Sequence, residues 1–281
     1  MRAVIFSAFP QEIRQIIKNL RAERRFQRHP FVLFSAEYFS KEIIVVLTGM
    51  GRENAEKAAK DLVKEYSPDL ALSIGFGGAL YKDAVIGEIV WGSRVFLIQK
   101  DIIETLELSY ARDAIRRLPR NLAIREGSIL TLENWMEKKD IKKILPDEFS
   151  FPVCDMETFF LAKWAEEKGL PFLAMRSVTD LIDEEIPQEF LSVTDEHGGY
   201  RFSRALKLIL GKPRLIKDIV KIGRNSRIAS DNLWSAVESL LEILCLTLIM
   251  QTLFKNLFNS IDYWEYLHLF IYRNIPTTIS Y

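Results

Sequence analysis

Apolar stretches of strand length alternate with one-sided helical stripes through most of the chain, and this alternation constrains the fold more than any other feature. The runs Ala3–Ser7 and Leu70–Ile74 have the length and composition of buried strands. Between them, residues 55–66 place their apolar side chains on one helical face, and Ser67-Pro68 ends that helix. Strands that alternate with helices favour a largely parallel or mixed sheet with helices on its faces. We therefore predict an α/β fold.

The remaining elements follow from the same patterns. Gly169 stands where a helix C-terminus is expected, with Pro171 just beyond it. Neither an internal repeat nor a low-complexity linker interrupts the pattern, so we expect a single domain over residues 1–244. Further strands are predicted at 31–36, 42–47, 86–98, 121–130, 151–155 and 172–178, and further helices at 11–20, 138–145 and 158–168.

Two regions stand apart from this pattern. Residues 181–222 form a long mixed segment, and inserted segments of this size are usually functional or carry small helices of their own. Residues 245–281 are apolar and aromatic. The uncharged run Ile243–Phe254 is shorter than the roughly 20 residues that a spanning helix needs. The tail could extend the last helix into a dimer interface, contact a membrane surface or pack into a core. A fourth possibility is that it was not selected as part of the domain, for example because it is read-through past the ancestral end.

Composition excludes several classes of protein. The net charge is zero, which gives no basic field for nucleic acid. Two distant cysteines in apolar surroundings indicate a reducing compartment, and the short apolar N-terminus is typical of a first strand and not of a signal peptide. We expect a cytoplasmic protein. The three histidines have no metal-ligand spacing, and no dinucleotide or P-loop pattern is present, so we expect neither metal nor cofactor.

Two carboxylate-bearing blocks carry the strongest functional signal. They are Cys154-Asp155-Met156-Glu157-Thr158 and Arg176-Ser177-Val178-Thr179-Asp180, and each lies at the end of an apolar run. Paired carboxylates suit a reaction in which a leaving group is protonated while a sugar becomes cationic. The two blocks therefore indicate a reaction that protonates a leaving group and stabilises a developing cation.

These blocks resemble the nucleoside phosphorylase and nucleosidase superfamily, most closely the 5′-methylthioadenosine/S-adenosylhomocysteine nucleosidases. The resemblance covers roughly Ala3 to Asp180. It implies a three-layer α/β/α fold around a mixed central sheet, and a homo-oligomer, a dimer or larger. In that family a glutamate after the first strand activates water, which implicates Glu12, and the aspartate corresponding to Asp180 protonates the purine.

The resemblance also implies substrate-binding roles. Met156 and Glu157 would contact the ribose, and Trp135 would stack on the base. Each residue has an alternative role: Glu12 suits the first turn of any helix, Asp180 suits a cap, and Met156 and Trp135 suit core packing. Glu157 is harder to explain structurally, because burial of an unpartnered carboxylate is costly.

Two glycine clusters complete the candidate site. Gly49 and Gly51, followed by Arg52, form either an anion-binding turn or a tight turn beside the ribose. The segment Gly75-Phe76-Gly77-Gly78 resembles the Gly-Ser-Ala-Gly-Gly loop of the family, which lines the ribose and base. Phe76 and Gly77 are therefore candidate binding residues, and Phe76 replaces a serine.

The nucleophile decides the reaction class. A carboxylate at Glu12, with no basic residue between Ser7 and Glu12, repels phosphate and favours water. We predict hydrolysis of a purine nucleoside of the adenosine type with a 5′ substituent. Phosphorolysis is the alternative, and a catalytically inactive nucleoside-binding protein is the alternative from another class. Residues 169–180 also resemble a branch associated with hopanoid biosynthesis, whose substrate is a bulky lipid nucleoside.

Overall fold

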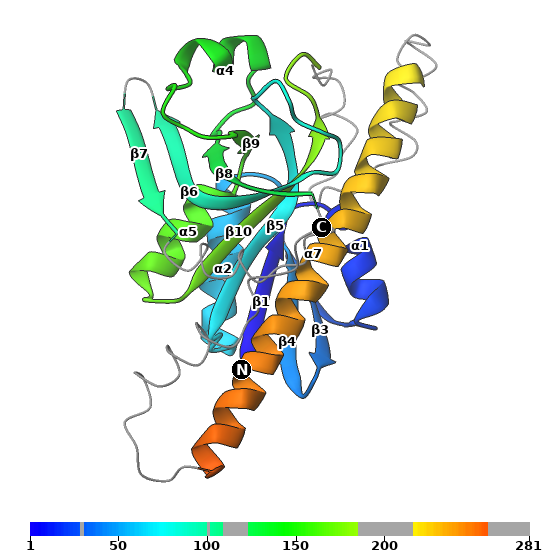
Figure 1. Ribbon diagram of the computed structural model, residues 1–281, viewed down its shortest axis with the longest axis vertical. Helices are drawn as coiled ribbons and strands as arrows, with labels where there is room; N and C mark the ends of the chain where they lie inside the picture. Colours follow the sequence, from blue (N-terminus) through cyan, green and yellow to red (C-terminus); the bar gives the residue numbers. More distant parts are fainter. Residues whose placement is uncertain (29–30, 100–101, 109–122, 185–215, 258–281) are drawn as a thin grey trace, which may run out of the picture. The chain divides into compact units, whose positions relative to one another are not determined.

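The computed structural model describes residues 1–28, 31–99, 102–108, 123–184 and 216–257 (Figure 1). The chain divides into two compact units, residues 1–241 and 242–281. The strands are β1 (Arg2–Ser7), β2 (Glu23–Arg28), β3 (Phe31–Tyr38), β4 (Lys41–Leu47), β5 (Leu70–Ala79), β6 (Ile89–Gln99), β7 (Ile102–Glu107), β8 (Ile124–Thr131), β9 (Val153–Asp155) and β10 (Phe172–Asp180). The helices are α1 (Pro10–Asn19), α2 (Arg52–Glu65), α4 (Lys138–Ile144), α5 (Thr158–Glu167) and α7 (Ile216–Leu257).

The strands form one mixed sheet of ten strands. Strand β1 lies at its centre, parallel to β4 on one side and to β5 on the other. Strand β10 runs parallel to β5 and antiparallel to β6, so that the path β10-β6-β8-β9-β5 returns to β10. This arrangement brings the carboxyl ends of β1, β5 and β10 to the same edge of the sheet.

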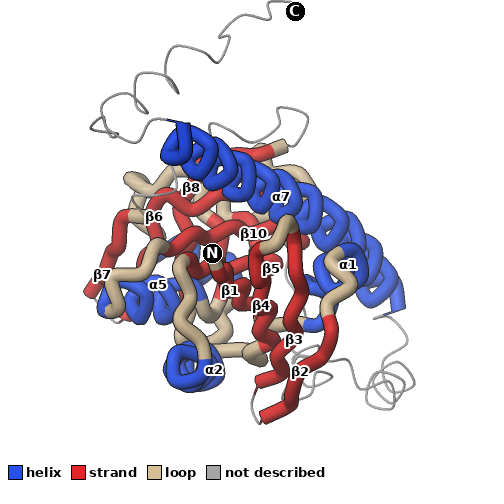
Figure 2. Tube along the Cα trace, turned by 90° about the horizontal axis from the view of Figure 1, so that it is seen from below, coloured by secondary structure: helices blue, strands red, loops and turns tan. Residues whose placement is uncertain are grey.

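Helices cover both faces of the sheet (Figure 2). Helices α2 and α5 lie on one face, and α1 lies on the other together with the portion of α7 up to Leu241. Buried Ile13 and Ile16 account for the placement of α1, and Ala229, Leu233 and Ala236 give α7 a buried stripe. The α/β class and the three layers that the sequence predicts are confirmed.

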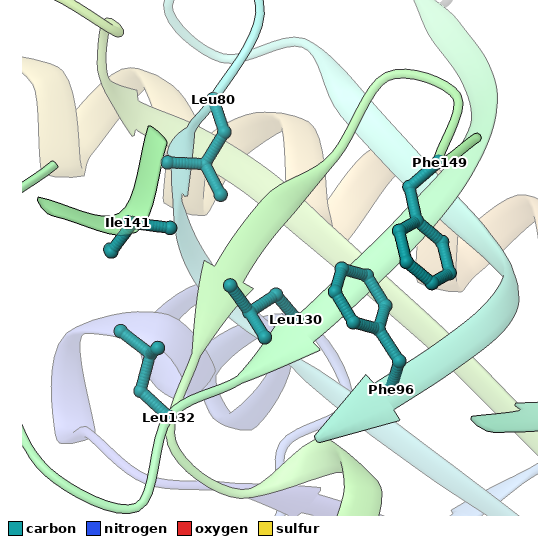
Figure 3. Close-up of a cluster of buried hydrophobic side chains, with 6 residues drawn as sticks. All are labelled: Leu80, Phe96, Leu130, Leu132, Ile141 and Phe149. Carbon is teal, nitrogen blue, oxygen red and sulfur yellow. The ribbon is translucent and has the colours of Figure 1, made fainter. Parts of the chain in front are cut away.

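A compact apolar cluster holds α4 in place (Figure 3). Ile141 of α4 packs with side chains from the end of β5, from β6 and from β8, and the rings of Phe96 and Phe149 stack with their centroids 3.7 Å apart. The members of the cluster are Leu80, Phe96, Leu130, Leu132, Ile141 and Phe149. This packing matters for the site because α4 carries a buried lysine.

Local structure departs from the sequence predictions at three places. Strand β2 was not predicted, and its residues 23–25 are exposed. The edge strand β7 was not predicted. Strand β5 does not end at Ile74 but continues through the glycine cluster to Ala79, because these glycines pair with β10 and β9.

The boundaries predicted for the domain remain predictions. Of the segment 181–222, the structure describes residues 181–184 and 216–222, and of the tail it describes residues 245–257, the last part of α7. Among the described helices, none combines the length and apolar character needed to cross a membrane.

Candidate active site

Glu12 lies at the third position of α1 and is buried, with four hydrogen bonds to its carboxylate. Its Oε2 accepts from the Oγ of Ser7 at 2.6 Å and from the backbone N–H groups of Ala8 and Phe9 at 3.0 and 2.9 Å. Its Oε1 accepts from the N–H of Phe76 at 2.7 Å. Burial raises the pKa of Glu12 above its usual value, and these donors oppose the shift.

The hydrogen bond from Phe76 comes from its backbone, and the side chain is half-buried. The family resemblance leads one to expect a serine hydroxyl at position 76. The phenyl group that replaces it does not remove the hydrogen bond to Glu12, because the donor is the backbone N–H. Gly75 is required by the same geometry, because a Cβ built there would lie 2.7 Å from Oε1 of Glu12. Strand β5 and the turn before α1 are thus in direct contact through one carboxylate.

Glu157 immediately precedes α5 and is 7% exposed. Its Oε1 accepts a hydrogen bond from the N–H of Gly51 at 2.7 Å. Burial, reinforced by the nearby charge of Asp155, raises the pKa of Glu157 to about 8. The carboxyl group of Glu157 therefore holds a proton over much of the neutral range.

Glu12 and Glu157 line one small cavity. Ser7, Thr48, Ser73 and Arg176 add polar groups to its wall, and Phe6, Ala8, Ile74 and Leu161 complete it. The space holds about one water molecule. A water at this point would be surrounded by carboxylates and hydroxyl groups, which can both orient it and accept its proton.

A buried ion pair supports the floor of this cavity. The guanidinium of Arg176 binds Oδ2 of Asp155 at 2.5 Å and also donates to Ser73 and Thr158. Asp155 in turn accepts from the hydroxyl groups of Thr131 and Thr158. Because every member of this network has partners, the network fixes the end of β9 against the middle of β10.

Asp180, the last residue of β10, is buried and paired with Lys138. The Nζ of Lys138 lies 2.5 Å from Oδ2 of Asp180, and the hydroxyl of Thr179 donates to Oδ1 at 2.8 Å. Burial raises the pKa of Asp180 above its usual value, and the ammonium group of Lys138 opposes that shift. The pair rests on Gly78, where a Cβ would lie 2.8 Å from Oδ2.

Strand β5 therefore contacts both predicted catalytic carboxylates. Gly75 adjoins Glu12 and Gly78 adjoins Asp180. Three residues of strand span about 10 Å. Asp180 is not among the residues that line the small cavity of Glu12 and Glu157.

The other candidate residues differ in how they are placed. Met156 and Trp135 are half-buried, Met156 after β9 and Trp135 between β8 and α4, and Gly77 is buried against Arg176. Gly49 and Gly51 adopt positive φ angles of 82° and 90° in the turn before α2. Arg52 is exposed and paired with Glu56 and Glu133 at 2.8 and 2.9 Å.

Three contributors were absent from the residues that the sequence singled out as site residues. Lys138 was seen only as part of a polar helix, although a lysine at the first position of a helix, where acidic residues are favoured, is a signal in itself. Ser7 and Gly75 act through contacts with Glu12 that only the folded chain reveals. Within the described parts of the chain, no group of three or more potential ligands is arranged to hold a metal ion.

Comparison with known families decides the lineage. The model of the family described as "Phosphorylase superfamily" matches residues 2–210. The chain belongs to this superfamily. Two curated relatives are 5′-methylthioadenosine/S-adenosylhomocysteine nucleosidases. The one from Shewanella loihica is 22% identical and covers 74% of this chain and 99% of its own, and the one from Buchnera aphidicola is 21% identical and covers 75% and 97%.

Solved structures share the fold. The 5′-methylthioadenosine/S-adenosylhomocysteine nucleosidase of Neisseria meningitidis, in complex with methylthio-immucillin-A, superposes with a TM-score of 0.63 at 17% identity. That match covers 85% of this chain and 98% of the other. Futalosine hydrolase of Helicobacter pylori gives the same TM-score at 17% identity, with coverage of 85% and 97%. The resemblance that the sequence motifs suggested is thereby confirmed.

Proposed function

We propose that this protein is an N-glycosyl hydrolase that releases the free base from a purine nucleoside, an adenosine with a substituent at its 5′ position. The observation that carries the proposal is the placement of two buried carboxylates, Glu12 and Asp180, against the first and the last glycine of the segment Gly75–Gly78 in β5. The curated relatives and the solved neighbours with nucleosidase names support the reaction class.

In this mechanism the two carboxyl groups do different work. Asp180 gives a proton to the departing base, and its burial, which raises its pKa above the usual value, favours the protonated form that this role needs. Glu12 accepts the proton of the attacking water, and it lines the small polar cavity that could hold such a water. Glu157 binds a ribose hydroxyl, and Met156 and Trp135 contact the ribose and the base.

The turn before α2 supports water over phosphate as the nucleophile. A phosphate would need the N–H of Gly51 and the guanidinium of Arg52. The N–H of Gly51 already donates to Glu157, and Arg52 is engaged by two glutamates. The buried carboxylate of Glu12 would also repel the anion. The homo-oligomeric state and the cytoplasmic location remain predictions.

Chromatographic detection of free base tests the proposal, with 5′-methylthioadenosine, S-adenosylhomocysteine and adenosine as substrates. The wild-type protein should release adenine from at least one of them. Asp180→Asn should lower kcat by about 10²- to 10⁴-fold, while calorimetry still detects nucleoside binding. Asp183→Asn is the matched control, because Asp183 is exposed and pairs only at the surface with Lys142; its rate should equal that of the wild type. Wild-type rates in both Asp180→Asn and Glu12→Gln would refute the assignment.

A further inference from the structure

Among the residues that the structure describes, Lys138 is the only buried lysine, and its ammonium group is surrounded by oxygen atoms. Only 5% of the residue is exposed. Its Nζ binds Oδ2 of Asp180 at 2.5 Å, the carbonyl oxygen of Asp180 at 3.0 Å and the carbonyl oxygen of Leu181 at 2.5 Å. Three acceptors match the three hydrogens of an ammonium group. The lysine is therefore held in one position against the end of β10.

This position is unfavourable for a lysine in two ways. Burial of a charged group requires compensation by a partner. Lys138 is also the first residue of α4, where the partial positive charge of the helix N-terminus disfavours a cation. The same end of the helix would favour an acidic residue. The presence of a lysine here despite both effects points to a requirement for positive charge beside Asp180.

Helix α4 is fixed well enough to set the distance between the two groups. Ile141 lies one turn after Lys138 on the same buried face of the helix and packs into the cluster around Leu130 and Phe96 (Figure 3). The cluster joins α4 to β6 and β8, so the ammonium group of Lys138 is held by a packed helix and not by a surface loop.

We propose that Lys138 is a positioning residue for the glycosidic cleavage: it orients the carboxyl group of Asp180 and strengthens that group as the acid that protonates the departing base. This inference rests on the proposed function. Lys138 covers Oδ2, so Oδ1, which also accepts from Thr179, is the oxygen that carries the proton toward the base. In the reaction the proton leaves Asp180 for the base as the N-glycosidic bond breaks, and Lys138 stays charged and stabilises the carboxylate that remains.

The other charged and titratable groups around Asp180 do not supply this effect. Glu184, which follows β10, is negative and raises the proton affinity of Asp180, and its own partner is Lys221 of α7. From β9, Cys154 faces the pair, and burial raises the pKa of its thiol to about 12, so it stays neutral. From β5, Gly78 contributes only backbone. Lys138 is the cation that directly pairs with Asp180 among the residues that the structure describes.

The test compares pH profiles of kcat/KM for base release from the best of the three nucleosides. In Lys138→Met the charge is lost, so the alkaline limb that reports deprotonation of Asp180 should move to higher pH by about one unit or more, and the maximal rate should fall by about 10-fold or more. Lys138→Gln, which keeps donors but no charge, should give the same shift, and it carries the test if the methionine variant does not fold. Lys138→Arg should restore the limb. Lys143→Met is the matched control on the same helix, since Lys143 is exposed and pairs with Asp140; its profile should be that of the wild type.

A double-mutant cycle separates this role from a structural one. If Lys138 acts through Asp180, Lys138→Met should add little to the loss already caused by Asp180→Asn. Losses that multiply, with the alkaline limb unmoved in the single variants, would overturn the inference and leave only a role in holding α4 to β10. A wild-type protein that releases no base from any of the nucleosides would instead contradict the proposed function itself.

Discussion

Gly75 lies so close to Glu12 that one added methyl group at position 75 would displace the carboxylate that we propose activates water. An alanine Cβ at position 75 would lie 2.7 Å from Oε1, 3.0 Å from Cδ and 3.2 Å from Oε2 of Glu12. Gly75 is not among the glycines with positive φ, so alanine adds no backbone strain. The three heavy atoms nearest to the methyl group therefore all belong to the carboxyl group of Glu12.

The size of the effect follows from the unequal bonding of the two carboxylate oxygens. Oε2 has three donors, whereas Oε1 has only the N–H of Phe76. The carboxylate should pivot about Oε2 and lose the bond to Phe76. A hydrogen bond to a charged group contributes about 1.5–3 kcal/mol, which corresponds to about 10- to 100-fold if the loss falls on the transition state. A shift of about 1 Å in a reacting group has a similar effect.

Steady-state kinetics of base release from 5′-methylthioadenosine measure this loss. We expect Gly75→Ala to lower kcat by about 10- to 100-fold with a smaller change in KM, and to change little in a Glu12→Gln background. Gly223→Ala is the matched control: Gly223 lies in α7 with no heavy atom within 4 Å of the added Cβ, so stability should rise by up to about 1 kcal/mol with kcat unchanged. A Gly75→Ala protein with the wild-type kcat would show that the position of Glu12 does not limit the reaction.

Two further predictions concern pH. The rate should fall at acid pH as Glu12 is protonated, with an apparent pKa above the usual value near 4.5, and this limb should be lost from the residual activity of Glu12→Gln; a limb that persists unchanged in that variant would exclude Glu12 as its origin. The pKa of Glu157 is raised from 4.5 to about 8 by folding, so its contribution to stability is fully present below pH 4.5 and is lost as pH rises toward 8. Denaturant titrations at pH 5 and pH 9 should therefore show a larger loss of unfolding free energy for the wild type than for Glu157→Gln, and equal losses would contradict the raised pKa.

The elements that the sequence predicted well are those in which local pattern and tertiary burial agree. The apolar stripe of α1 and the buried runs of β1, β4 and β10 face a core, so periodicity alone located them within a few residues. Strand β7 escaped prediction because it is an edge strand with an exposed, alternating pattern. The glycines after Ile74 resemble a turn in sequence, yet in the fold they extend β5.

The candidate site shows a similar division. Glu157 and Asp180 became candidates because each lies in a carboxylate-bearing block after an apolar run, and Glu12 became one through the family resemblance. Lys138 has no such context, since its partner lies 42 residues away in the chain. Nor could the sequence reveal that Gly51 donates to Glu157 across 106 residues, which is the contact that bears on the choice between water and phosphate.

The central claim is that water attacks the sugar while Asp180 protonates the base. The most direct measurement follows the products of 5′-methylthioadenosine and S-adenosylhomocysteine in the presence of inorganic phosphate, with adenine quantified by chromatography and sugar phosphates by ³¹P NMR. The account predicts adenine at the same rate with and without phosphate, and no sugar 1-phosphate. Sugar 1-phosphate formed in step with adenine, and adenine only when phosphate is present, would contradict it.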